Sequence, residues 1–111
     1  MKEYLFTYGT LQKDKVQLEL FGRLLTGASD TLNGHKTVSI EIKDESFLSK
    51  GGGKDQLMLM PSDDKTDSIQ GLVFEILEDE LLTADKYEPD GYTRVKIKLE
   101  SGKDAWVYME G

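Results

Sequence analysis

The sequence predicts an α+β protein in which six or seven strands form a small antiparallel or mixed β-barrel flanked by two or more short helices. Three observations support this fold class. Many short segments are dense in β-forming residues or alternate apolar with polar residues, while only two stretches have helical spacing. Short turn sequences separate neighbouring strands, which favours antiparallel pairing. A length of 111 residues suits one domain with its own core, so we expect residues 1–111 to fold as a unit.

The composition excludes several classes of chemistry. The chain has no cysteine and one histidine, which excludes disulfides, thiolate nucleophiles and metal sites built on Cys or His ligands. Acidic residues outnumber basic ones by 21 to 14, and the net charge of −7 argues against nucleic-acid binding. The apolar runs are too short to span a bilayer. We therefore expect a soluble cytoplasmic protein without nucleic-acid or membrane partners; the pattern indicates no particular oligomeric state.

The first elements are a strand and a helix. Residues 2–8 form a short, dense run of aromatic and aliphatic side chains, typical of a central strand covered on both faces. Asp14 could cap a helix that continues to about Leu25, and Gly27 supplies a stop signal for it.

Three strands are predicted in the middle of the chain. After Asn33-Gly34, a strong hairpin signal, the pattern changes to period two, with Val38, Ile40 and Ile42 on one face. Residues 56–60 form a second strand, which Pro61 ends, and residues 69–77 form a third, more apolar one. The glycine-rich residues 50–54 between them read as a flexible connection.

A short helix and a hairpin close the chain. Residues 78–86 have helical character, with Leu77, Leu81 and Leu82 on one side. Two alternating strands follow around Val95–Leu99 and Ala105–Met109, joined by a turn at residues 101–103.

With the usual nucleophiles excluded, carboxylate chemistry remains, and Glu88 is the candidate. It follows a predicted helix, precedes the turn Pro89-Asp90-Gly91 and is flanked by Tyr87 and Tyr92. Aromatic walls would desolvate its carboxyl group and raise its pKa towards the range useful for proton transfer. The other reading is a surface glutamate in a polar turn. His35, beside a glycine in a turn, is expected to be solvated rather than catalytic.

A second candidate is Tyr8-Gly9-Thr10-Leu11, where the first strand gives way to the helix. Such a turn can bring backbone N–H groups close to a small anion. The tyrosines at 8, 92 and 108 fit either the core or a cavity wall, and Arg94 could pair with an acidic neighbour or hold a ligand carboxylate.

Four segments together resemble the γ-glutamylcyclotransferase family, in the small-domain branch that includes the γ-glutamylamine cyclotransferases. The resemblance covers nearly the whole chain. Its segments are Leu5-Phe6-Thr7-Tyr8-Gly9-Thr10-Leu11, Gly71-Leu72-Val73-Phe74-Glu75-Ile76, the stretch 82–94, and Trp106-Val107-Tyr108.

The resemblance implies a small closed or nearly closed barrel and a role for each matching residue. Glu88 would be the general base and acid, Tyr8, Gly9, Thr10 and Leu11 would hold the γ-glutamyl group, and Tyr92 and Tyr108 would line the cavity. The implied reaction cyclises a γ-glutamyl amine or amino acid to 5-oxoproline and releases the amine. The substrate's own amine is the nucleophile, so no metal or cofactor is required.

Two departures from the family pattern motivate an alternative function. Pro89-Asp90 separates Glu88 from Gly91, and Gly51-Gly52-Gly53 occupies a place where relatives carry a different segment. The alternative is a non-catalytic barrel that binds a small acidic metabolite or a protein partner.

Overall fold

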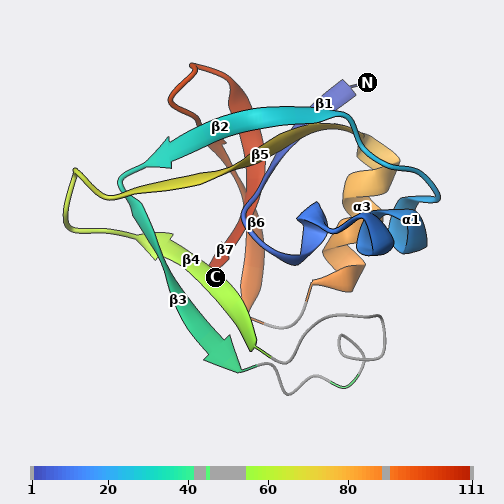
Figure 1. The fold of residues 1–111 in the computed structure, drawn as a ribbon, viewed down its shortest axis with the longest axis horizontal. Coiled ribbons are helices and arrows are strands. Elements are labelled where there is room, and N and C mark those ends of the chain that lie inside the picture. Colours follow the sequence, from blue (N-terminus) through green and yellow to red (C-terminus); the bar gives the residue numbers. More distant parts are fainter. Residues whose placement is uncertain (1, 42–44, 46–54, 89–90, 111) are drawn as a thin grey trace.

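Seven strands, two α-helices and one 3-10 helix are formed by the residues that the computed structural model describes, which are 2–41, 45, 55–88 and 91–110 (Figure 1). In chain order they are β1 (Lys2–Thr7), η1 (Thr10–Gln12), α1 (Asp14–Phe21), β2 (Gly27–Asn33), β3 (His35–Glu41), β4 (Asp55–Pro61), β5 (Ser68–Leu77), α3 (Glu78–Tyr87), β6 (Tyr92–Lys98) and β7 (Asp104–Glu110).

The strands form two sheets. A five-stranded sheet has the order β2-β5-β1-β7-β6, and β3 pairs with β4 in a separate ribbon. Within the larger sheet β1 runs antiparallel to β5 and parallel to β7, where Leu5 lies opposite Trp106. The mixed α+β class is therefore confirmed, but among the described strands the sheet does not close, so the barrel description was too strong.

The Asn33-Gly34 sequence does not make the hairpin that it predicted. Gly34 has a positive φ of 74°, and its N–H donates a hydrogen bond to the carbonyl of Asp67. At this point the chain leaves one sheet for the other, because β2 pairs with β5 while β3 pairs with β4. Asn33-Gly34 does form a turn, but the turn connects strands of two different sheets and not the two strands of a hairpin.

The central strand β1 is covered on both faces, as predicted. Leu5 belongs to a buried cluster with the residues of α1 and α3, including Val16 and Leu81. Phe6, its neighbour, points to the opposite face and packs in a second cluster with Leu59 of the β3–β4 ribbon. The two helices thus cover one face of the sheet and the ribbon lies against the other (Figure 1).

Helix α1 is shorter than predicted and β2 was missed. The helix stops at Phe21 because Gly22 adopts a left-handed φ of 71° and its N–H closes on the Leu18 carbonyl. Gly27, expected as the stop, instead begins β2. The sequence of β2, Gly-Ala-Ser-Asp-Thr-Leu-Asn, is poor in β-forming residues, and its pairing with β5 determines its conformation.

Helix α3 was predicted within one residue, but its buried face was assigned incorrectly. Leu81, Ala84 and Tyr87 are buried, as their spacing allows, whereas Leu77 and Leu82 are 49% and 55% exposed. The helix is consequently rotated so that its last buried residue, Tyr87, brings Glu88 to the edge of the core. No helix among the described residues is long and apolar enough to cross a membrane.

Candidate active site

Glu88 lies where α3 ends, beside the last two strands. Its backbone is extended, and its N–H donates to the Ala84 carbonyl at 3.1 Å, which closes the helix. The carboxyl group faces a pocket of about 340 Å³ between α3, β6 and β7. The pocket is lined by Asp85, Glu88, Tyr92, Thr93, Arg94, Trp106 and Tyr108.

Strand register explains why these side chains meet. Arg94 of β6 lies directly opposite Tyr108 of β7, and Lys96 lies opposite Trp106. Residues that face each other across an antiparallel pair project to the same side of the sheet, and period two adds Tyr92 to that side. Helix α3 covers this side, so it presents Asp85 and Glu88 to the same space.

The pocket changes the acidity of Glu88. Burial of the carboxyl group, followed by the nearby negative charge of Asp85, raises the pKa of Glu88 to about 8 from a normal value of 4.5. At neutral pH the group is therefore largely protonated, and modest changes in its surroundings switch its charge. A carboxyl group in this state can both accept and donate protons.

Four tyrosines surround Glu88. Burial, and after it the Glu88 charge, raises the pKa of Tyr92 to about 12; burial, Glu88 and then Glu19 raise the pKa of Tyr87 to about 12. The pKa values of Tyr8 and Tyr108 are also raised, mainly by burial, and Glu88 contributes to both. Three of the predicted site tyrosines, at 8, 92 and 108, thus lie within the electrostatic reach of the predicted catalytic glutamate.

An ion pair that was not predicted as part of the site lies beside Glu88. Both oxygens of Asp85 accept hydrogen bonds from Arg94, from Nε at 2.8 Å and from Nη2 at 3.0 Å. The guanidinium group stacks over the Trp106 ring at 4.4 Å from its centroid. Of the two roles considered for Arg94, the structure shows the pairing with an acidic neighbour. Asp85 could have been found from its spacing, since residues three apart share a helix face.

The opening segment approaches the site from the end of β1. The Tyr8 hydroxyl donates to the Tyr108 backbone carbonyl at 2.6 Å, which ties the segment to β7. An added Cβ at Gly9 would meet no atom within 4 Å, so the backbone there is open to a ligand. Leu11 is buried in the core, and its carbonyl accepts a hydrogen bond from Gln17.

Tyr8, Gly9 and Leu11, whose side-chain environments the structure describes, are not among the residues that line the Glu88 pocket. Tyr8 is near Glu88, while Thr10 begins η1 and its side chain is outside the described part of the structure. The first amides of a 3-10 helix have no partner within the helix, so they remain available as donors. The roles assigned to Gly9, Thr10 and Leu11 stay predictions.

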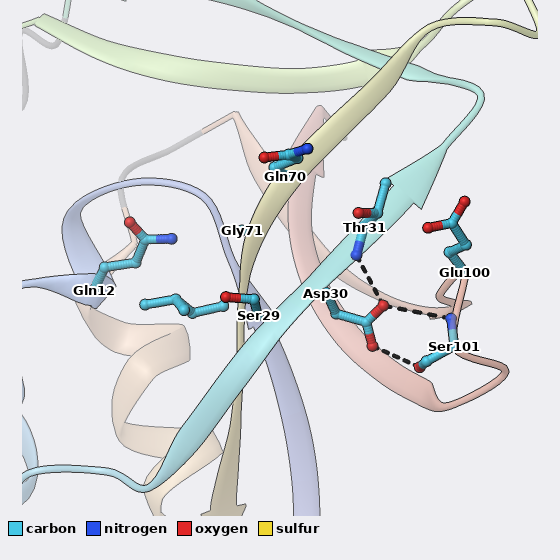
Figure 2. A pocket seen from close by; sticks show the side chains of 9 residues that line it. Gln12, Ser29, Asp30, Thr31, Gln70, Gly71, Glu100 and Ser101 are labelled. Atoms are coloured by element: carbon cyan, nitrogen blue, oxygen red, sulfur yellow. Dashed lines mark hydrogen bonds between the residues drawn. The ribbon is translucent and has the colours of Figure 1, made fainter.

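A second groove, of about 610 Å³, lies on the other side of the opening segment. Figure 2 shows its main carboxylate, Asp30, held by the hydroxyl of Ser101 at 2.6 Å and by the Thr31 amide at 2.8 Å. Gln12, which follows the opening segment, reaches this groove, and its side chain donates to the Thr7 carbonyl. None of the predicted site residues lines this groove.

The remaining candidates take no part in the Glu88 pocket. His35 is the first residue of β3, and its Nδ1 is 2.9 Å from the Asn33 carbonyl oxygen. Within residues 2–41, 45, 55–88 and 91–110, no three His, Cys, Asp or Glu side chains are placed to hold a metal ion. The departures at Pro89-Asp90 and Gly51-Gly52-Gly53 lie outside the described residues.

The fold and the pocket define a small mixed α+β domain whose carboxylate site lies at the exit of a helix. Residues 5–110 match the profile of the family described as gamma-glutamyl cyclotransferase, AIG2-like. The chain belongs to this family. A comparison with curated protein sequences finds no match.

Solved structures share the fold. A protein of Arabidopsis thaliana, solved in solution, is 24% identical with a TM-score of 0.72, and the alignment covers 98% of this chain and 68% of that one. A protein of Pyrococcus horikoshii is 17% identical with a TM-score of 0.67, covering 98% and 78%. A structure named gamma-glutamyl cyclotransferase is 17% identical with a TM-score of 0.66, covering 100% and 68%.

Proposed function

We propose that this protein is a cyclotransferase that converts the γ-glutamyl group of a small amine or amino acid to 5-oxoproline and releases the amine. The observation that carries the proposal is Glu88, a carboxyl group with a pKa of about 8 that faces a pocket beside the opening segment. Family membership supports the reaction class.

In this reaction the nucleophile belongs to the substrate, so the protein forms no covalent bond with it. Glu88 in its carboxylate form takes a proton from the α-ammonium of the substrate, and the free amine attacks the γ-carbonyl carbon. A C–N bond forms and closes a five-membered ring. Glu88 then gives this proton to the departing nitrogen as the second C–N bond breaks, and the extra proton on the ring nitrogen passes to the released amine, which leaves as an ammonium ion. One carboxyl group performs both transfers, and a pKa near the working pH suits a group that must do so.

The other requirements are geometric. The substrate must be held so that its amine lies close to its own carbonyl, since positioning supplies much of the rate in such reactions. The oxygen that becomes negative during attack needs fixed donors, for which the amides of Gly9, Thr10 and Leu11 are our candidates. Tyr92 and Tyr108 would form the wall that keeps water from Glu88.

Incubation with a panel of γ-glutamyl amines and amino acids, with detection of 5-oxoproline, tests the proposal. We expect turnover of at least one compound, and we expect Glu88→Gln to lower kcat by about 10²- to 10⁴-fold because it removes general acid–base catalysis while keeping the shape. Equal inactivity of wild type and Glu88→Gln across the panel would remove the catalytic proposal.

A non-catalytic binding protein is the second candidate. It is favoured by one observation, namely that Tyr8, Gly9 and Leu11 do not line the Glu88 pocket in the described part of the structure. In that case the panel gives no 5-oxoproline, while γ-glutamyl compounds or small dicarboxylates still perturb the NMR signals of Tyr92 and Tyr108.

A further inference from the structure

Two tyrosine hydroxyl groups near Glu88 direct their protons to backbone carbonyl oxygens. The Tyr92 hydroxyl lies 2.9 Å from the Leu57 carbonyl oxygen, and the Tyr8 hydroxyl lies 2.6 Å from the Tyr108 carbonyl oxygen. A carbonyl oxygen can only accept, so each tyrosine must be the donor. Neither proton is then available to Glu88.

Tyr108 is directed in the same way by Asp85. Its hydroxyl lies 2.6 Å from Oδ1 of Asp85 and 3.4 Å from the Leu81 carbonyl oxygen. Asp85 forms an ion pair with Arg94 through two hydrogen bonds, and the carboxylate of such a pair can only accept. The Tyr108 proton is therefore held on Asp85.

Some of the donors at the edge of the pocket are also engaged by acidic side chains. Nε and Nη2 of Arg94 are used by Asp85, and the Trp106 indole N–H donates to Glu3 at 3.1 Å. Hydroxyls whose protons are committed elsewhere offer only their lone pairs to the pocket. Beside Glu88, the pocket thus offers the acceptor lone pairs of the Tyr92 and Tyr108 hydroxyl oxygens, which complement a ligand group with several N–H donors.

We propose that Asp85 is a positioning residue that holds the Tyr108 hydroxyl proton away from Glu88, so that the pocket presents acceptors to the primary ammonium group of its ligand. The inference rests on the proposed function, in which that group is the α-ammonium of the γ-glutamyl moiety. It adds a role for the Asp85–Arg94 pair, which a purely structural reading would treat as a brace between α3 and β6.

The two readings differ in what they predict for Glu88. The ionisable or charged groups that face it are Asp85 and Tyr87 from α3, Tyr8 after β1, Tyr92 and Arg94 from β6, and Tyr108 from β7.

Asp85→Asn keeps the shape of the side chain and removes one negative charge. The new amide can donate to the Tyr108 oxygen, which frees the Tyr108 proton to turn towards Glu88. Both changes favour the Glu88 carboxylate, so its pKa should fall.

The test measures the Glu88 titration and ligand preference without requiring turnover. Carbon-13 NMR of the glutamate carboxyl groups gives the pKa of Glu88, with Glu88→Gln for assignment. Calorimetry compares L-glutamate with glutarate, which lacks only the ammonium group. We expect wild type to prefer L-glutamate by about tenfold or more, the value of one or two hydrogen bonds to a charged group. Asp85→Asn should lower the pKa of Glu88 and reduce the preference.

A matched control lies on the same helix. Glu80 accepts two hydrogen bonds from Arg23, at 2.9 and 2.7 Å, away from the pocket. Glu80→Gln should leave both readouts unchanged. Tyr108→Phe keeps the Asp85–Arg94 pair and removes the acceptor oxygen, so it should reduce the preference for L-glutamate over glutarate. This variant takes the place of Asp85→Asn in the test if Asp85→Asn does not fold.

The outcomes separate this inference from the proposed function. An unchanged Glu88 pKa in Asp85→Asn, or a change that Glu80→Gln reproduces, overturns the positioning role. Equal binding, or no binding, of the two probes by wild type overturns the ammonium preference. A protein that shows the predicted titration and preference but yields no 5-oxoproline from the panel retains the positioning role and loses the proposed reaction.

Discussion

Two grooves formed by the described residues each contain a carboxyl group, and they shift its pKa in opposite directions. In the larger groove, desolvation acts to raise the pKa of Asp30, but hydrogen bonds from Ser101 and the Thr31 amide outweigh it and lower the pKa. In the smaller pocket, burial and the charge of Asp85 raise the pKa of Glu88 to about 8. Asp30 receives hydrogen bonds that stabilise its carboxylate, whereas Tyr8, Tyr92 and Tyr108, near Glu88, donate their hydroxyl protons to other acceptors.

The difference shows that the volume of a groove is a poor guide to its chemistry. Asp30 links β2 to the β6–β7 turn through hydrogen bonds from Ser101 (Figure 2). Because these bonds stabilise its carboxylate form, the group is not suited to exchange protons. The position of Glu88 makes the charged form of its carboxyl group unfavourable and so raises its pKa. A raised pKa of this kind is the property that a proton-transfer group needs. Three experiments can break or sharpen this contrast.

The largest expected effect is on turnover. Glu88→Gln should lower the rate of 5-oxoproline formation by about 10²- to 10⁴-fold, whereas Asp30→Asn should change it by less than about twofold. Both variants remove one carboxylate and keep its shape. Steady-state kinetics on the best substrate of the panel makes the comparison. A similar loss in both would mean that the larger groove takes part in the reaction.

Another effect is expected on stability, from two glycines, Gly71 in β5 and Gly9 in the opening segment. A Cβ at Gly71, which lines the larger groove, would press against the Thr7 carbonyl and the Phe6 ring. Gly71→Ala should therefore lower the free energy of unfolding by about 1–3 kcal/mol, as overpacking does. Gly9→Ala has open space and should leave it almost unchanged. Urea denaturation measures both; equal values would contradict the packing described here.

The third effect is on the pH dependence of stability, and its sign differs between the grooves. A raised folded-state pKa means that the contribution of Glu88 is complete below pH 4.5 and is lost as the pH rises through about 8. The contribution of Asp30, whose pKa is lowered, is present above pH 3.8 and is lost on acidification. Melting temperatures of Glu88→Gln should decline less than those of wild type towards alkaline pH, and Asp30→Asn should lose less in acid. Parallel curves for all three proteins would refute the contrast.

Much of the fold could be predicted because local pattern and final environment agree. The dense run in β1 predicts a strand covered on both faces, and Leu5 and Phe6 do pack on opposite sides of the sheet. The alternation in β7 predicts its buried side, since Ala105, Val107 and Met109 are buried. Strand β2 could not be predicted because its small and polar residues carry no β signal and its conformation depends on β5.

The candidate site was predicted less completely, for a related reason. Glu88 and its flanking tyrosines are close in sequence, so a helix exit with aromatic neighbours was visible. The partnership of Asp85 with Arg94 and Tyr108 depends on the register of β6 and β7 against α3, which single-sequence patterns do not specify. The buried face of α3 was ambiguous for the same reason, because Leu77, Leu81 and Leu82 fit more than one rotation of the helix.

The parallel pairing of β1 with β7 affects how the molecule is made as well as its final shape. The Tyr8 hydroxyl bonds to the Tyr108 carbonyl, 100 positions later, and β1 sits between β5 and β7 in the sheet. Neither the sheet nor the Glu88 pocket can be completed until the last strand has been synthesised. During translation, the edge of β1 that pairs with β7 therefore stays unpaired until β7 has been made. Folding of the site is thus a late event that depends on contacts distant in sequence.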